Sequence, residues 1–210
     1  LHSPLSPAAT RSQLEVSAGQ CSDRGRKPSN QDFYGLRVPG EPLLSTKGIA
    51  VAIADGISSS DVSHVASETA VASFLEDYFC TPETWSVKKS AHRVLSATNS
   101  WLQAQTRHSP HYGDNDRGYL CTFSALILKS VTAHILHVGD TRIYRLRDQQ
   151  LEQITSDHRV RISHSQSYLG RALGLDSHVE IDYHTLTLLE GDIFILAKDG
   201  VYEFVDKALL

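Results

Sequence analysis

Three aspartates in this chain stand where an apolar run of residues ends. Asp55 closes the run "GIAVAIAD", Asp140 follows "AHILHVG", and Asp199 follows "DIFILAK". Strands of this composition are buried and rigid, so carboxylates at their ends can converge without long flexible side chains. Converging carboxylates repel one another unless they are protonated or bind cations, and oxygen ligands favour Mg²⁺ or Mn²⁺ over zinc. The pattern therefore predicts a site for hard divalent cations.

Two further features support such a site, and one simpler interpretation opposes it. Gly56 has no Cβ, so its carbonyl could approach a cation as another oxygen ligand. The polar loop "RGRKPSNQD" adds the carboxylate of Asp32 and the ammonium of Lys27, a cation suited to phosphate. The simpler interpretation is that each aspartate is an independent turn residue, because Asp-Gly is common at strand ends. That interpretation leaves the polar loop unexplained.

The elements that must position these residues alternate between strand and helix patterns. Alternating or apolar runs predict strands at 14–23, 33–38, 48–55, 121–128, 132–140, 142–148 and 151–155, the last two joined by a hairpin turn. Helical periodicity predicts helices at 61–75 and 87–105. A short helical piece at 168–174 precedes a last strand that ends at 197 and a helix that begins at Gly200. The order predicts an α+β domain with helices packed on a mainly antiparallel sheet system.

Composition excludes several classes of function. The 210 residues are 40% hydrophobic and 21% charged, as in ordinary globular domains, and the net charge of −4 predicts no nucleic-acid partner. No apolar run reaches the length that a membrane-spanning helix needs. Cys21, Cys80 and Cys121 are far apart, which predicts a reducing compartment, hence the cytoplasm, and no zinc site. We expect residues 1–13 to form a disordered lead-in to one domain at 14–210.

The eleven histidines are not expected to bind metal. His134 and His137 are three residues apart in a predicted strand, so their side chains should point to opposite faces of the sheet. His158 follows an aspartate in a polar turn, and we interpret it as structural.

Seven short segments follow one another in a specific order: "GRKPSNQDF", "AIADG", "CTFSALIL", "HVGDTRIYRL", "LEQITSDH", "YLGRALG" and "LAKDGVYEF". Each is unspecific alone. Together, over residues 14–207, they resemble the metal-dependent protein serine/threonine phosphatases of the PP2C (PPM) family. The resemblance is strongest to the bacterial phosphatase modules that are joined to a serine/threonine kinase in one polypeptide.

This resemblance implies both a fold and an activity. The fold would be a four-layer α/β/β/α sandwich, a mostly antiparallel central β-sandwich flanked by helix pairs. The activity would be hydrolysis of phosphoserine and phosphothreonine in proteins by water activated between two Mn²⁺ or Mg²⁺ ions, beside which a third ion would bind more weakly. The implied partners are phosphoproteins and a serine/threonine kinase, either fused to the chain or encoded nearby.

The metal ligands of the family can be assigned residue by residue. The resemblance makes Asp55 the carboxylate that bridges two ions, and the carbonyl of Gly56 a ligand of one of them. Asp199 would be a terminal ligand of the other ion. Asp140 and Asp199 together would frame the weaker third site.

The first of the seven segments, "GRKPSNQDF", is called the first motif below, and it supplies further residues of the expected site. At several positions this chain also departs from the usual sequence of the family. Asp32, with Gln31 in place of the usual Glu, would orient water beside the metals, and Lys27 would bind phosphate where the family usually has Arg. Lysine binds phosphate as a point charge, without the two-pronged geometry of arginine. Lys198 stands where Ser or Thr normally precedes the last Asp-Gly, so it brings a cation close to the metals. The family's final metal-binding Asp has no counterpart up to Leu210, and we expect the chain to continue.

Two other functions remain open at this point. One is a catalytically impaired phosphatase-fold module that regulates a partner or fused kinase, which Gln31, Lys27 and the missing last carboxylate favour. Retention of the three strand-end aspartates favours the enzyme, because a scaffold needs no like charges there. The other is a metal-dependent phosphoesterase of small molecules or nucleic acid, and the net negative charge argues against nucleic acid.

Overall fold

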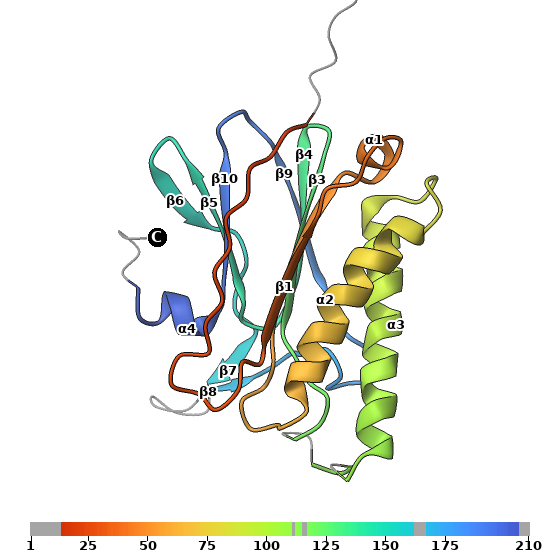
Figure 1. Cartoon of the computed structure of the whole chain (residues 1–210), viewed down its shortest axis with the longest axis vertical. Coiled ribbons are helices and arrows are strands. Elements are labelled where there is room, and N and C mark those ends of the chain that lie inside the picture. The colour runs from red at the N-terminus through yellow and green to blue at the C-terminus, as the bar shows by residue number, and fades with distance from the viewer. Residues whose placement is uncertain (1–13, 111, 115–116, 162–166, 206–210) are drawn as a thin grey trace, which may run out of the picture.

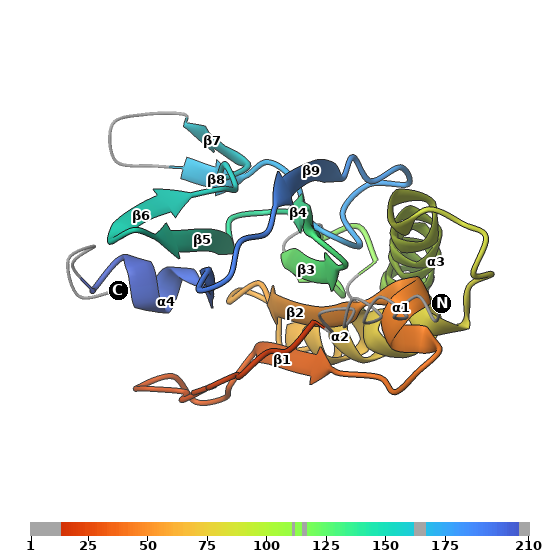
Figure 2. The same cartoon turned by 90° about the horizontal axis from the view of Figure 1, so that it is seen from above.

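The computed structural model of the chain describes residues 14–110, 112–114, 117–161 and 167–205. The expected lead-in at 1–13 lies outside these residues. Two long helices, α2 (Ser63–Cys80) and α3 (Val87–His108), cover one face of an antiparallel sheet, and a second, smaller sheet lies on its other side (Figures 1 and 2). The predicted combination of helices with antiparallel sheets is therefore confirmed.

The larger sheet has five strands in the order β1-β2-β3-β4-β9. They are β1 (Asp32–Arg37), β2 (Ile49–Asp55), β3 (Phe123–Lys129), β4 (Thr132–Val138) and β9 (Asp182–Thr187). All of its pairings are antiparallel. The central strands β2 and β3 have layers on both faces, which explains why their sequences are apolar almost throughout.

The smaller sheet has three strands in the order β10-β5-β6. They are β5 (Arg142–Arg147), β6 (Gln150–Gln153) and β10 (Ile193–Ala197). The predicted hairpin joins β5 to β6, and its two turn residues, Asp148 and Gln149, have φ of 51° and 60°. A separate hairpin of β7 (Arg159–Arg161) and β8 (Ser167–Leu169) and two short helices, α1 (Leu43–Lys47) and α4 (Asp199–Tyr202), complete the described elements.

Two apolar clusters hold the three layers together. One lies between the helix pair and the larger sheet, where the rings of Phe74 and Phe123 are 5.1 Å apart in an edge-on arrangement. The other lies between the sheets and includes Ile49, Ile135 and Ile143. Both long helices of the described residues belong to the first cluster, so a second helix pair, the fourth of the expected layers, is not among the described elements. No helix in this part of the chain is long and apolar enough to cross a membrane.

Two local predictions were wrong, for tertiary reasons. Residues 14–23 form no strand: Leu14 and Val16 pack against the cluster between the sheets, but the backbone joins no ladder. The expected helical piece at 168–174 is instead the end of β8 followed by a bridge in which Leu173 exchanges backbone hydrogen bonds with Cys121 at 2.9 and 3.2 Å. Alternating or helical patterns in such short segments are overruled by the partners available around them.

Candidate metal and phosphate site

A pocket of about 160 Å³ lies where β2 ends and α4 begins. It collects five of the residues expected at the site, which come from four separate parts of the chain: Lys27, Asp55, Gly56, Asp140 and Asp199. The other lining residues are Ile57, Ser58, Thr122, Arg159 and Leu169. The fold therefore gathers the strand-end aspartates, which the interpretation as independent turn residues does not require.

The register of the first two strands brings the sixth expected residue, Asp32, beside Asp55. The two are directly opposite each other in the antiparallel pairing of β1 with β2. Residues opposite in such a pair have Cα atoms only about 4.5–5.5 Å apart and side chains on the same face. Burial, together with the charges of Asp32 and Asp199, raises the pKa of Asp55 to about 9. A carboxylate pair of this kind requires either a proton or a cation to balance it.

A lysine provides part of that balance. The ammonium of Lys198 forms an ion pair with Oδ2 of Asp32, and the two side chains are only 18% and 8% exposed. Burial opposes the charged form of Lys198, but the bond to Asp32 and the charges of Asp32, Asp55 and Asp199 raise its pKa above the ordinary value. The other oxygen of Asp32, Oδ1, is buried and has no hydrogen-bond partner within the described part of the chain.

Gly56 is fixed by its backbone and by its lack of a side chain. Its N–H donates to the carbonyl of Gln31 at 3.0 Å. A Cβ at this position would lie 2.8 Å from both oxygens of Ser63 and 2.9 Å from the carbonyl of Gln31. A side chain here would therefore displace the loop of the first motif or the start of α2, the two segments that frame the pocket.

Gln31 connects two segments that frame the pocket. Its amide Nε2 donates to the carbonyl of Ser60 at 2.6 Å, across 29 residues of sequence. The hydroxyl of Ser67 in α2 donates to the carbonyl of Gln31 at 2.6 Å. The side chain thus ties the loop before β1 to the loop after β2.

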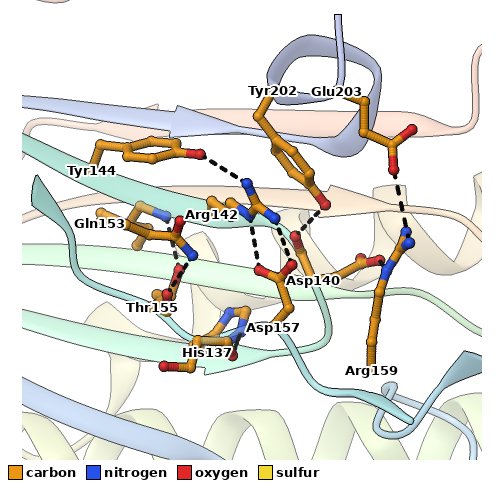
Figure 3. A network of polar contacts seen from close by, with 12 residues as sticks. His137, Asp140, Arg142, Tyr144, Gln153, Thr155, Asp157, Arg159, Tyr202 and Glu203 are labelled. Carbon is orange, nitrogen blue, oxygen red and sulfur yellow. Dashed lines mark hydrogen bonds and ion pairs between the residues drawn. The ribbon is translucent and has the colours of Figure 1, made fainter. Parts of the chain in front are cut away.

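Asp140 follows β4 and is paired with an arginine that no sequence motif indicated. Its Oδ2 accepts a hydrogen bond from Nε of Arg159 at 2.7 Å, and its backbone carbonyl accepts one from the hydroxyl of Tyr202 at 2.9 Å (Figure 3). Burial raises the pKa of Asp140, although Arg159 opposes the shift. In the sequence, Arg159 is distinguished only by its place in the polar stretch after His158. Its partner, Asp140, is 19 residues earlier in the chain, so no local pattern connects the two.

The turn that carries Asp140 is stabilised by a hydrogen bond to His158. Nδ1 of His158 accepts a hydrogen bond from the N–H of Gly139 at 3.0 Å, and its Nε2 is 3.0 Å from a carboxylate oxygen of Asp182. Gly139 has a φ of 109°, and a Cβ there would lie 2.6 Å from Thr122. The structural role predicted for His158 is therefore confirmed.

The network beyond this turn fixes the position of Tyr202. The guanidinium of Arg142 binds both carboxylate oxygens of Asp157, at 2.9 and 2.7 Å, and lies 3.6 Å from the ring centre of Tyr202 (Figure 3). Tyr202 is the last residue of α4, the short helix that begins with Asp199, so the network holds the end of this helix beside the turn of Asp140.

His134 and His137 have different hydrogen-bond partners, as expected for side chains on opposite faces of β4. The Nδ1 of His134 is 2.7 Å from the hydroxyl of Tyr183, whereas His137 is fully buried and its Nδ1 is 2.8 Å from the hydroxyl of Ser124. Each imidazole therefore forms a hydrogen bond on a different face of β4.

The donors around the pocket fit Mn²⁺ or Mg²⁺. They are carboxylate and carbonyl oxygens, which these ions prefer, and the buried Oδ1 of Asp32 has no other partner among the described residues. In the present side-chain arrangement, no three His, Cys, Asp or Glu side chains of the described residues already form a metal-binding group. The ligands predicted from the sequence thus share one pocket, while Lys198 binds the nearby carboxylate of Asp32.

Comparison with known proteins finds a family whose model covers most of the chain. A family model described as "Protein phosphatase 2C" matches residues 22–209. The serine/threonine phosphatase Stp of Listeria monocytogenes serotype 4b (strain F2365) is 27% identical over 207 residues, which cover 89% of this chain and 78% of the relative. The serine/threonine protein phosphatase PstP of Mycobacterium tuberculosis (strain ATCC 25618 / H37Rv) is 30% identical over 204 residues, which cover 88% of this chain and 38% of the relative.

Solved structures show the same fold. The serine/threonine phosphatase Stp1 from Staphylococcus aureus superimposes with a TM-score of 0.74 at 19% identity, covering 88% of this chain and 76% of that one. The catalytic domain of PstP in complex with two manganese ions superimposes with a TM-score of 0.68 at 23% identity, covering 86% and 76%.

Proposed function

This chain belongs to the protein phosphatase 2C family, and we propose that the pocket around Asp55 is its active site. The chain is a metal-dependent protein serine/threonine phosphatase that hydrolyses phosphoserine and phosphothreonine in proteins. Mn²⁺ or Mg²⁺ is its cofactor, as the two manganese ions in the related PstP structure support.

Different residues of the pocket would bind different metal ions. The carboxylate of Asp55 would bridge the two ions, with the carbonyl of Gly56 as a ligand of one and Asp199 as a ligand of the other. Asp140, together with Asp199, would frame a weaker third position once its carboxylate is shared with or released by Arg159. When bound, the ions supply an activated water molecule and positive charge for the phosphate oxygens.

Asp32 and Lys27 would act on water and substrate. The unpartnered Oδ1 of Asp32 can accept a hydrogen bond from the attacking water and so orient it. Lys27 lies on the pocket wall in an exposed loop, where its ammonium can bind a phosphate oxygen as the substrate arrives. Direct attack by water needs no covalent phosphoenzyme, so this site requires no cysteine or serine nucleophile.

The observation that carries the proposal is the buried pair of Asp32 and Asp55. Two carboxylates placed opposite each other and out of water destabilise the fold unless a cation or a proton compensates them. A phosphatase-fold scaffold that only regulated a kinase would gain nothing from this arrangement. The regulatory alternative is therefore not favoured.

The proposed activity also bears on the partners of the protein and on its location in the cell. Phosphoproteins are the substrates, and we propose that a serine/threonine kinase, fused or encoded nearby, is the functional counterpart. Cys21, Cys80 and Cys121 are all unpaired, which supports the reducing environment of the cytoplasm.

Release of phosphate from a phosphothreonine peptide tests the proposal. The peptide should be hydrolysed in Mn²⁺, a mononucleotide should be hydrolysed far more slowly, and a chelator should abolish both rates. Undiminished turnover after exhaustive metal removal would contradict the proposal. A faster rate on the mononucleotide would assign the chain to phosphoesterases of small molecules instead.

A further inference from the structure

Lys198 is the single residue between β10, which ends at Ala197, and α4, which begins at Asp199. Its side chain turns inward over Gly200: a Cβ on that glycine would lie 3.1 Å from Cε and 3.6 Å from Nζ of Lys198. The absence of a side chain on Gly200 therefore leaves room for the lysine. The inward course brings the ammonium to Oδ2 of Asp32, with most of both side chains out of solvent.

Two of the three carboxylates near this ammonium, those of Asp55 and Asp199, are proposed metal ligands. Asp32 and Asp55 are opposite each other in the β1–β2 pairing, and Asp199 directly follows Lys198 in the chain. The charges of all three carboxylates act on the lysine. A divalent cation placed among them would be attracted by the same carboxylates and repelled by the ammonium, and both effects are strong where water is excluded.

We propose that Lys198 is a tethered cation that competes with the metal for this carboxylate cluster. Without metal, its ammonium neutralises Asp32 and stabilises the buried carboxylate pair. When Mn²⁺ binds at Asp55, the ammonium leaves Asp32, and the cost of breaking that ion pair lowers the affinity for metal. The inference rests on the proposed function, because it concerns the same metal site, and it adds a regulatory contact that sets how much metal the site requires.

Calorimetric titration with Mn²⁺ alone tests the competition. Lys198→Ser should bind Mn²⁺ about tenfold more tightly than the wild type or better, since the ion no longer displaces an ammonium. Lys198→Arg retains the charge and should not show this gain. Lys27→Ser is the matched control: it removes an equal charge from the wall of the pocket that Asp55 lines, and its affinity for Mn²⁺ should change less than about threefold because Lys27 is exposed and screened.

The outcomes separate this inference from the proposed function. Equal or weaker Mn²⁺ binding by Lys198→Ser, or an equal gain in Lys27→Ser, would overturn the competition and leave a metal-dependent enzyme. Absence of Mn²⁺ binding in both wild type and variant would overturn the proposed function together with the inference.

A measurement on the wild-type chain covers the case in which the variant does not fold. Acylation of lysine amines, followed by mass spectrometry, should label Lys198 slowly in chelator and several-fold faster in Mn²⁺, because displacement exposes the amine. The labelling of Lys88, an exposed lysine of α3, should not respond to metal. Equal labelling of Lys198 in the two conditions would contradict displacement.

Discussion

Lys27 and Arg159 both place a cation on the wall of the pocket that Asp55 lines. Arg159 is bonded to Asp140 at 2.7 Å, whereas Lys27 lies in the exposed loop that precedes β1. A guanidinium that already binds a carboxylate has less charge to offer a phosphate. At the scale of single residues, Lys27 is therefore the cation expected to bind the substrate.

Replacing Lys27 should weaken substrate binding more than it slows the reaction. Lys27→Ala is expected to raise KM roughly tenfold with a much smaller effect on kcat, because the loop cation contacts the phosphate both before and during attack. Lys27→Arg should keep or improve KM, since a guanidinium can bind two phosphate oxygens. Steady-state kinetics on a phosphothreonine peptide measures both, with Arg26→Ala as the neighbouring control. An unchanged KM in Lys27→Ala would make Arg26 the next candidate.

Among the elements, β3 and β4 are tied to the segment after β6 by one buried histidine. The carbonyl of Ser156 can only accept, so Nε2 of His137 donates to it at 3.1 Å, and Nδ1 accepts from the hydroxyl of Ser124 at 2.8 Å. The hydroxyl of Thr141 lies 2.7 Å from that of Ser124 and completes the chain. In the neutral imidazole, Nε2 as donor and Nδ1 as acceptor satisfy both bonds. Burial, with a smaller effect of His158, lowers the pKa of His137 to about 4.

This histidine should make the fold sensitive to acid. Its pKa rises to about 6.5 on unfolding, so the stability it contributes is complete above that pH and is lost as the pH falls through about 4. The effect between pH 7 and pH 5 should be about 2 kcal/mol of unfolding free energy.

Urea unfolding at the two pH values measures this loss. His137→Gln should show a loss smaller by about that amount, even though the variant is less stable at pH 7. His108→Gln, at the exposed end of α3, should keep the wild-type difference between the two pH values. If His137→Gln showed the wild-type difference as well, the buried histidine would not be the group that titrates.

The elements that the sequence could predict are those with a long, consistent pattern. The helix expected at 87–105 is α3, whose buried residues repeat every three or four positions and whose start is capped by Ser86 accepting from the N–H of Lys89 at 3.2 Å. The apolar strand at 48–55 is β2. By contrast, residues 14–23 alternate like a strand but form none, because backbone pairing depends on a partner that the segment itself does not specify.

The candidate site was predictable as a set of residues but not as a set of contacts. Strand-end position identified Asp55, Asp140 and Asp199, and the structure places all three on one pocket. The pairing of Lys198 with Asp32 joins residues 166 positions apart, and no local pattern predicts it. The same holds for Arg159, whose importance comes from the fold of the β7–β8 hairpin.

At the scale of the whole molecule, the pocket joins segments that are distant in the chain. Asp55 ends a strand of the larger sheet, and Asp199 opens the helix that follows the smaller sheet (Figure 1). A metal ion bound by both would link the two sheets. A ligand that binds only the folded state stabilises it, by about 2.7 kcal/mol when its concentration is one hundred times Kd.

Mn²⁺ should therefore raise the Tm of the wild-type chain, and the rise should increase with metal concentration. Asp199→Asn, which removes the charge from one of the two linked segments, should lose most of this rise. Differential scanning calorimetry in chelator and in a Mn²⁺ series provides the comparison. A Tm that is the same at every Mn²⁺ concentration would show that the two sheets are not joined through a metal.

The account as a whole depends on Asp55 holding the metals, and one substitution tests this most directly. Asp55→Asn keeps the shape of the side chain but removes the charge, so turnover of a phosphothreonine peptide in saturating Mn²⁺ should fall roughly a hundredfold or more. In chelator, the same variant should be as stable as the wild type or more stable, because the fold no longer has to keep a buried carboxyl protonated beside Asp32 and Asp199. Near-normal turnover of Asp55→Asn in Mn²⁺ would contradict the account and return Asp55 to the role of a turn residue.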